Sequence, residues 1–234
     1  MVDRSRSPNI ALLIDADNAS PQTLEQVLTV LAELGTVNIR RVYGNWSKAA
    51  LKGWAEMTHR HALEPQQQFD VTKGKSATDM KMTIDAMDLL ARGQVDGFGI
   101  MSSDSDFMPL AMRIRQDGLP VYGFGTAKTP LSFQQACSRF IDVGALVERE
   151  DAPDEPRPAV DPALVELLGD AIRASRRDER GFASLSEVGQ RASARSSFDA
   201  RSYGFARLSE LVQAIPNFAT ETREGGRMFV KRVR

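Results

Sequence analysis

The sequence predicts an α/β fold, a mostly parallel sheet flanked by helices, followed by a small winged helix-turn-helix domain. Short apolar runs alternate with helical segments as far as residue 147, which is typical of a parallel sheet with helices on both faces. Two of these runs, residues 10–14 and 99–101, each end in a cluster of carboxylates. Three further helical segments and a hairpin follow a proline-rich stretch, which predicts a separate second domain.

In the first part of the chain, the predicted helices have recognisable start and stop signals. Ser20 and Pro21 are typical of a helix N-cap and first helical residue, and Gly35 ends that helix. Ser76 and Asp79 have the spacing of a capping box. The predicted strands are residues 10–14, 37–44, 66–71, 99–102, 119–125 and 141–147, and the predicted helices are residues 21–34, 48–60, 76–92, 107–117 and 129–140.

The second part of the chain begins after a stretch that contains four prolines, Pro153, Pro156, Pro158 and Pro162. We place the first domain at residues 1–148, the linker at 149–162 and the second domain at 163–234. The second domain is predicted to contain helices at residues 163–174, 184–194 and 205–215, then a hairpin of residues 218–223 and 227–230 that turns through 224–226.

The composition is that of an ordinary globular protein of 234 residues with a formal net charge of -1. Residues 160–234 carry 13 basic and 10 acidic side chains, so the second domain is mildly basic. Cys137 is the only cysteine, which excludes an intramolecular disulfide and a cysteine zinc cluster. No apolar run has membrane-spanning length, and residues 1–8 lack the apolar core of a signal peptide, so we expect a cytoplasmic protein without a membrane partner.

The two acidic clusters form the candidate functional site. Asp15 and Asp17 follow the first apolar run, and Asp104 and Asp106 follow the second. Because ligands of open α/β sheets bind outside the carboxyl ends of the strands, we expect these carboxylates to face one crevice. They would repel one another without a cation, and hard oxygen ligands favour Mg²⁺ or Mn²⁺. Helix capping is the simpler role for any one of them. Asn18 either holds a catalytic water or orients Asp15, or it is an ordinary turn residue.

The helix predicted from residue 76 offers a further carboxylate. Asp79 lies in its first turn, where an acid also stabilises a helix without any catalytic role. Asp85 and Asp88 are alternatives at later turns, but at roughly 100° per residue Asp85 lies about 600° from Asp79 and therefore on another face. We prefer Asp79 as the carboxylate that this helix delivers to the crevice.

Several residues are candidates for contact with nucleic acid. Lys73 and Lys75 precede this helix and are candidates for phosphate contacts, although loop lysines are usually only solvated. Trp46 follows the second predicted strand and either stacks on a base or packs in the core. In the second domain, Arg201 is a candidate phosphate contact, and Tyr203 either stacks on a base or fills the core.

Ordered motifs cover nearly the whole chain. The first part contains Ile14-Asp15-Ala16-Asp17-Asn18, then Lys75-x-x-x-Asp79 with Asp85 following, then Ser102-Ser103-Asp104-Ser105-Asp106-Phe107. Through them, residues 9–147 resemble the NYN domains, which are PIN-like metal-dependent ribonucleases. The second part contains Leu185-Ser186-Glu187-Val188, the segment 203–211 and Met228-Phe229-Val230. Through these, residues 163–233 resemble the OST-HTH, or LOTUS, domain.

The resemblance implies a PIN-like nuclease whose substrate is RNA and whose second domain binds RNA or docks a protein partner; a homodimer is left open. It implies that one or two ions, Mg²⁺ or Mn²⁺, are held by Asp15, Asp79, Asp104 and Asp106, with Asn18 in support. Two other classes compete with this interpretation. One is a non-catalytic RNA-binding adaptor, and the other is a haloacid dehalogenase-type phosphatase with Asp15 as covalent nucleophile, in which Ala19 replaces the usual Thr or Val.

Overall fold

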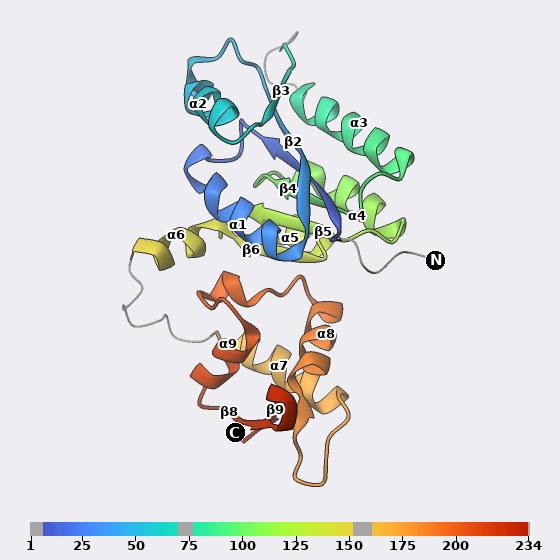
Figure 1. Cartoon of the computed structure of the whole chain (residues 1–234), viewed down its shortest axis with the longest axis vertical. Coiled ribbons are helices and arrows are strands. Elements are labelled where there is room, and N and C mark those ends of the chain that lie inside the picture. The colour runs from blue at the N-terminus through green and yellow to red at the C-terminus, as the bar shows by residue number, and fades with distance from the viewer. Residues whose placement is uncertain (1–6, 70–76, 152–160, 234) are drawn as a thin grey trace. The chain divides into compact units, whose positions relative to one another are not determined.

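The computed structural model describes residues 7–69, 77–151 and 161–233. The chain divides into two compact units, Met1–Gly144 and Ala145–Arg234 (Figure 1). The first is an α/β domain, and the second is a small domain of helices and a short sheet. The candidate phosphate contacts Lys73 and Lys75 lie outside the described residues, as does Ser76 of the predicted capping box. Within the described ranges, no helix has the length and apolarity that a membrane crossing requires.

The first unit is built on a six-stranded sheet in the order β3-β2-β1-β4-β5-β6, and every neighbouring pair is parallel. The strands are β1 (Asn9–Asp15), β2 (Thr36–Gly44), β3 (Glu64–Gln67), β4 (Gly97–Met101), β5 (Val121–Gly125) and β6 (Arg139–Asp142). The chain starts in the middle with β1, runs outward through β2 and β3, and returns to the other side of β1 with β4. The direction of winding therefore reverses between β1 and β4, and the crevice of such a sheet lies outside the carboxyl ends of these two strands.

Helices cover both faces of this sheet (Figure 1), which confirms the predicted fold class. They are α1 (Leu24–Leu34), α2 (Lys52–Arg60), α3 (Ala77–Arg92), α4 (Met108–Gln116) and α5 (Leu131–Ala136). One core cluster joins α3, α4 and α5 to the face of β1 that carries Leu13. On the opposite face, Leu31 of α1 and Leu12 of β1 lie so close to Gly99 that an added Cβ would be 3.2 Å from each side chain. Because β1 is buried on both faces, its sequence is an unbroken apolar run.

Two predicted strands were displaced, and both lie at the edges of the sheet. The strand predicted at residues 66–71 is β3, Glu64–Gln67, a polar edge strand whose Glu-Pro-Gln-Gln sequence carries no apolar alternation. The strand predicted at 141–147 is β6, Arg139–Asp142, and the helix before it ends at Ala136. Asp142 then accepts a hydrogen bond from the Gly144 amide (2.9 Å) at the start of α6 (Val143–Asp151). Residues 149–151, which we assigned to the linker, are the last residues of α6.

The second unit contains the predicted helices and hairpin. Its elements are α7 (Pro162–Ala174), β7 (Ala183–Ser184), α8 (Leu185–Arg195), α9 (Leu208–Ala214), β8 (Phe218–Arg223) and β9 (Arg227–Arg232). The strands form an antiparallel sheet in the order β7-β9-β8, with Gly225 and Gly226 at positive φ in the hairpin turn. The helix predicted from residue 205 begins only at Leu208, because a 3₁₀ turn at Ala200–Tyr203 ends at Gly204 with φ +75°.

Candidate metal centre

The candidate site forms where β1 and β4 end beside each other. Asp15 is the last residue of β1, and Ser102 directly follows β4. The loops beyond the two strands are joined by a hydrogen bond from the Ser103 amide to the Asn18 carbonyl oxygen (3.3 Å). Asn18 thus helps to hold the two loops together through its backbone, and its side chain is exposed.

The loop after β4 turns at once into a 3₁₀ helix, Ser105–Phe107, which carries the second acidic cluster. Asp104 is its N-cap, and its Oδ1 accepts a hydrogen bond from the Asp106 amide (2.9 Å). Phe107 is fully buried and anchors this short helix in the core. Asp106 remains exposed, because it lies on the outer side of the turn. Helix capping therefore accounts for the hydrogen bond of one Asp104 oxygen, and it does not account for the acidic side chain at position 106.

Three carboxylates from two elements converge at this point. Asp79, in the first turn of α3, offers an oxygen within 4.8 Å of oxygens from Asp104 and Asp106. Asp79 and Asp104 are half-buried, and Asp106 is exposed. An all-oxygen, all-anionic donor set of this size fits a hard divalent cation such as Mg²⁺ or Mn²⁺. Without a cation, water only partly screens the repulsion among the three carboxylates.

Asp15 does not belong to this group of three and lies fully buried at the end of β1. Its Oδ1 accepts hydrogen bonds from the amides of Asp17 (3.1 Å) and Asn18 (3.3 Å), and its Oδ2 accepts one from the Ser102 hydroxyl (2.7 Å). Burial raises the pKa of the Asp15 carboxyl, and these hydrogen bonds oppose the rise by stabilising the carboxylate. A hydrogen bond with the Asn18 side chain acts in the same direction, so the Asp15 carboxylate is surrounded by hydrogen-bond donors.

Ser102 connects Asp15 to the acidic cluster. Its hydroxyl donates to Asp15 and accepts a hydrogen bond from the Asp104 amide (3.0 Å), and its side chain is fully buried. Asp15 therefore acts on the position of Asp104 through a single hydroxyl group. Sequence reasoning missed Ser102 as a site residue. The available signal was a small hydroxyl residue at the junction between a buried strand and an acidic turn.

The remaining acidic residues of the motifs have other partners. Asp17 lies 3.3 Å from the Lys48 ammonium group and pairs with it. Asp85, the alternative to Asp79 on α3, is buried and accepts hydrogen bonds from Lys81 (2.7 Å) and from the Tyr43 hydroxyl (3.2 Å). Burial, with the nearby Asp85 carboxylate second, raises the pKa of the Tyr43 phenol, which therefore stays a proton donor. Asp85 thus braces α3 against β2, while Asp79 reaches the acidic cluster.

The predicted contacts to nucleic acid have mixed surroundings. Trp46 is half-buried, and its indole N–H donates to the Gln66 carbonyl (3.2 Å), which ties the end of β2 to β3. In the second unit, the Arg201 side chain is only 13% exposed and pairs with Asp199 at 3.1 Å. Tyr203 packs against Phe198, with ring centroids 6.0 Å apart. The structure therefore gives Arg201 and Tyr203 packing roles, and their contact with RNA stays a prediction.

The chain is similar over part of its length to proteins from Methanocaldococcus jannaschii and Vibrio parahaemolyticus. A Methanocaldococcus jannaschii protein described as uncharacterized is 29% identical over 134 residues, covering 53% of this chain and 52% of that protein; the chain thus spans about half the length of this relative. A protein of unknown function from Vibrio parahaemolyticus has a solved structure with a TM-score of 0.49 and 18% identity, covering 60% of this chain and 96% of that one. A TM-score below 0.5 carries no functional argument.

Family models identify both parts of the chain. The NYN domain model matches residues 9–146, and the OST-HTH/LOTUS domain model matches residues 158–230, in the predicted order. The NYN match covers the whole sheet and all three clustered carboxylates. NYN domains belong to the nuclease superfamily. The chain therefore belongs to the NYN domain family and carries an OST-HTH/LOTUS domain after its NYN domain.

Proposed function

We propose that this protein is a divalent-metal-dependent ribonuclease that hydrolyses RNA phosphodiester bonds at the carboxyl ends of β1 and β4. The observation that carries the proposal is the convergence of oxygens from Asp79 of α3 with oxygens from Asp104 and Asp106 of the 3₁₀ helix after β4, all within 4.8 Å of one another. Structural roles do not require this convergence. Asp104 needs only one oxygen to cap its helix, and Asp106 is an exposed acid placed beside two others.

In this proposal the three carboxylates hold one or two ions, Mg²⁺ or Mn²⁺. A bound divalent ion supplies Lewis acidity, which acidifies water and offsets charge on the phosphate. Asp15 fixes the loop that presents Asp104, because Ser102 bridges its carboxylate to the Asp104 amide. The side chains of Ser102 and Asn18 both hydrogen-bond to Asp15 and hold its carboxyl group in place. Asn18 keeps the two loops in register through its carbonyl oxygen.

The second domain is proposed to increase affinity for RNA or to dock a protein partner. Its exposed basic side chains include Arg180 and Arg195, which are 61% and 49% exposed. Arg180 pairs with Glu221 and Arg195 with Asp170, but both side chains are more exposed than that of Arg201. A cytoplasmic location and a homodimer also remain proposals.

Of the two competing interpretations, the phosphatase is disfavoured by the geometry of Asp15. A covalent nucleophile needs an accessible carboxylate oxygen, whereas Asp15 is fully buried and accepts three hydrogen bonds. The adaptor interpretation shares the same fold and the same two domains, so only a cleavage measurement separates it from the nuclease.

The test is cleavage of a labelled single-stranded RNA by the full chain, with Mg²⁺, with Mn²⁺ and with EDTA. Wild type is expected to cleave only with metal, and Asp104→Asn is expected to lose about 100-fold or more in rate while still binding RNA. Asparagine keeps the helix cap, so the variant removes charge and little else. Asp117→Asn, at an exposed position after α4, is the matched control. Cleavage by Asp104→Asn at the wild-type rate contradicts the site, and binding without cleavage by wild type supports the adaptor.

A further inference from the structure

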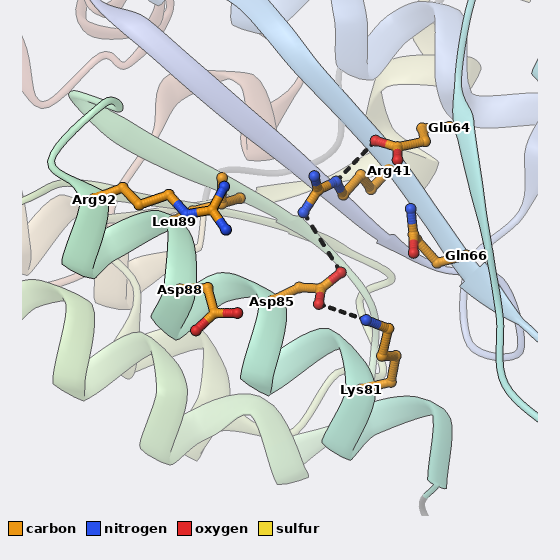
Figure 2. A pocket seen from close by; sticks show the side chains of 8 residues that line it. All are labelled: Arg41, Glu64, Gln66, Lys81, Asp85, Asp88, Leu89 and Arg92. Carbon is orange, nitrogen blue, oxygen red and sulfur yellow. Dashed lines mark hydrogen bonds and ion pairs between the residues drawn. The ribbon is translucent and has the colours of Figure 1, made fainter.

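A second polar site lies along α3, away from the first turn that carries Asp79. It is a pocket of about 200 Å³ between α3 and the β2–β3 edge of the sheet (Figure 2). Its charged lining residues are Arg41, Glu64, Lys81, Asp85, Asp88 and Arg92. The volume is below the roughly 300–1,000 Å³ that is typical for drug-sized ligands, so the pocket suits a group of the size of one nucleobase.

The charges of this pocket balance, because three cations face three carboxylates. Arg41 pairs with Glu64 (2.9 Å) and Asp85 (3.5 Å), and Lys81 pairs with Asp85 (2.7 Å), as the dashed lines in Figure 2 mark. A phosphate would meet the three carboxylates, and a metal ion would meet the three cations. The lining instead favours a neutral ligand that presents both hydrogen-bond donors and acceptors.

Asp88 and Arg92 are the two charged groups of the pocket that this network does not use. Both lie on exposed turns of α3, four residues apart, and Figure 2 shows Arg92 extending toward Arg41. Neither of them makes an ion pair with any residue in the described ranges. The pocket therefore offers one carboxylate and one guanidinium that a ligand can pair with at little cost.

We propose that this pocket binds an unstacked guanine base of the RNA substrate, with Asp88 and Arg92 as the specificity-determining residues; the proposal rests on the proposed ribonuclease function. Guanine donates from N1–H and N2–H, which match the two oxygens of one carboxylate, and accepts at O6 and N7, which match an arginine fork. Adenine presents an acceptor at N1, which a carboxylate repels. Arg41 and Lys81 form ion pairs with Asp85, so Asp88 is the carboxylate that is left for the guanine edge.

The pocket and the carboxylate cluster lie on opposite sides of α3. Asp88 lies nine residues after Asp79, roughly 14 Å along the helix axis at 1.5 Å per residue and about 900° around it at 100° per residue. A single strand that reaches both must therefore pass around the helix, so the pocket suits a base several nucleotides away from the phosphate at the carboxylate cluster. The sequence preference of cleavage is then set by a site on the NYN domain itself.

The test measures binding of the full chain to hexanucleotide RNAs in EDTA, so that neither cleavage nor metal contributes. The probes are labelled hexauridine and the same RNA with one guanosine, or one adenosine, at each position in turn. Guanosine at one position is expected to tighten binding about tenfold, and adenosine is not. Asp88→Asn and Arg92→Gln are each expected to remove this gain, whereas the helix-end pair Asp117→Asn and Arg113→Gln on α4 keeps it.

The proposal is overturned if guanosine does not tighten the binding of hexauridine to wild type, or if Asp88→Asn and Arg92→Gln keep the same increase in affinity. It is also overturned if none of the hexanucleotides binds. Failure of the ribonuclease proposal is seen separately, as RNA binding without metal-dependent cleavage. The Asp104→Asn variant distinguishes the two sites, because it is expected to lose cleavage and retain the preference for guanosine.

Discussion

Replacing Asp106 with asparagine is expected to stabilise the ion-free protein and to remove its stabilisation by divalent ions. Asp106 offers an oxygen within 4.8 Å of oxygens from Asp79 and Asp104. Two unit charges about 5 Å apart repel by about 0.8 kcal/mol in water and by about 3 kcal/mol at an effective dielectric constant of 20. Because Asp106 is exposed and the other two carboxylates are half-buried, the lower value is appropriate. Removing the two repulsions that involve Asp106 is therefore worth about 2 kcal/mol.

The assay is thermal unfolding of the full chain in EDTA and in a series of Mg²⁺ or Mn²⁺ concentrations. At about 2–4 °C per kcal/mol for a protein of this size, Asp106→Asn is expected to raise the Tm of the NYN domain in EDTA by about 4–8 °C, and less in high salt. Wild type is expected to gain about 2.7 kcal/mol when the ion reaches 100 times its Kd, and the variant much less. Asp117→Asn, which loses only an exposed ion pair with Arg113, is expected to change stability by less than about 1 kcal/mol. A lower Tm for Asp106→Asn in EDTA, or a wild-type Tm that does not respond to either ion, refutes the reasoning.

Three further predictions concern Ser102 and Cys137, two buried residues of the NYN domain. Ser102→Ala is expected to lower the free energy of unfolding by about 1–3 kcal/mol, because it leaves the buried Asp15 carboxylate and the Asp104 amide without their shared partner. Urea unfolding measures this difference, and Ser132→Ala at an exposed position of α5 is the control. Equal stabilities of Ser102→Ala and wild type contradict the prediction. Burial raises the pKa of the Cys137 thiol to about 12. An aromatic disulfide reagent at pH 8 is therefore expected to label this thiol only after denaturation. Rapid labelling of the folded protein contradicts the burial of Cys137. Because the pKa of this thiol is higher in the folded protein than its ordinary value of 9.0, the stability that the thiol contributes is complete below pH 9 and declines as the pH rises toward 12. A comparison of the unfolding free energies of wild type and Cys137→Ala across this pH range measures the decline.

The central strands and helix starts were predictable from local sequence because each carries its own chemical signal. β1 is apolar along its whole length, since both of its faces are buried, and Pro21 and Gly35 bound the first helical region. The edge strands were placed less well. β3 has one partner strand and an open edge, so its sequence is polar, and β6 is followed at once by a helix that Asp142 caps.

The sequence also indicated that Asp79 and Asp85 do not share a face of the helix, because helix geometry places the two side chains about a third of a turn apart. The structure brings Asp79 to Asp104 and Asp106, and it places Asp85 in a buried network with Tyr43. The role of Asp79, Asp104 and Asp106 as metal ligands stays a prediction. The burial of Arg201, in contrast, was not predictable from the sequence. Nothing in the local sequence indicates that its guanidinium is mostly buried against Asp199, because that burial depends on how the helices of the second unit pack.

The sequence by itself therefore determined the fold class, the order of the two domains and the acidic residue types at the ends of two strands, because periodicity, capping and motif spacing are local properties. Only the tertiary structure decided which carboxylates share a site, because β1 and β4 are far apart in the chain and become neighbours through the strand order. It also decided that Asp15 lies beneath the cluster, linked to it by Ser102, and that α3 and β2 enclose a charge-balanced pocket. Such features arise from side chains that converge from separate elements, and no local sequence pattern specifies that convergence.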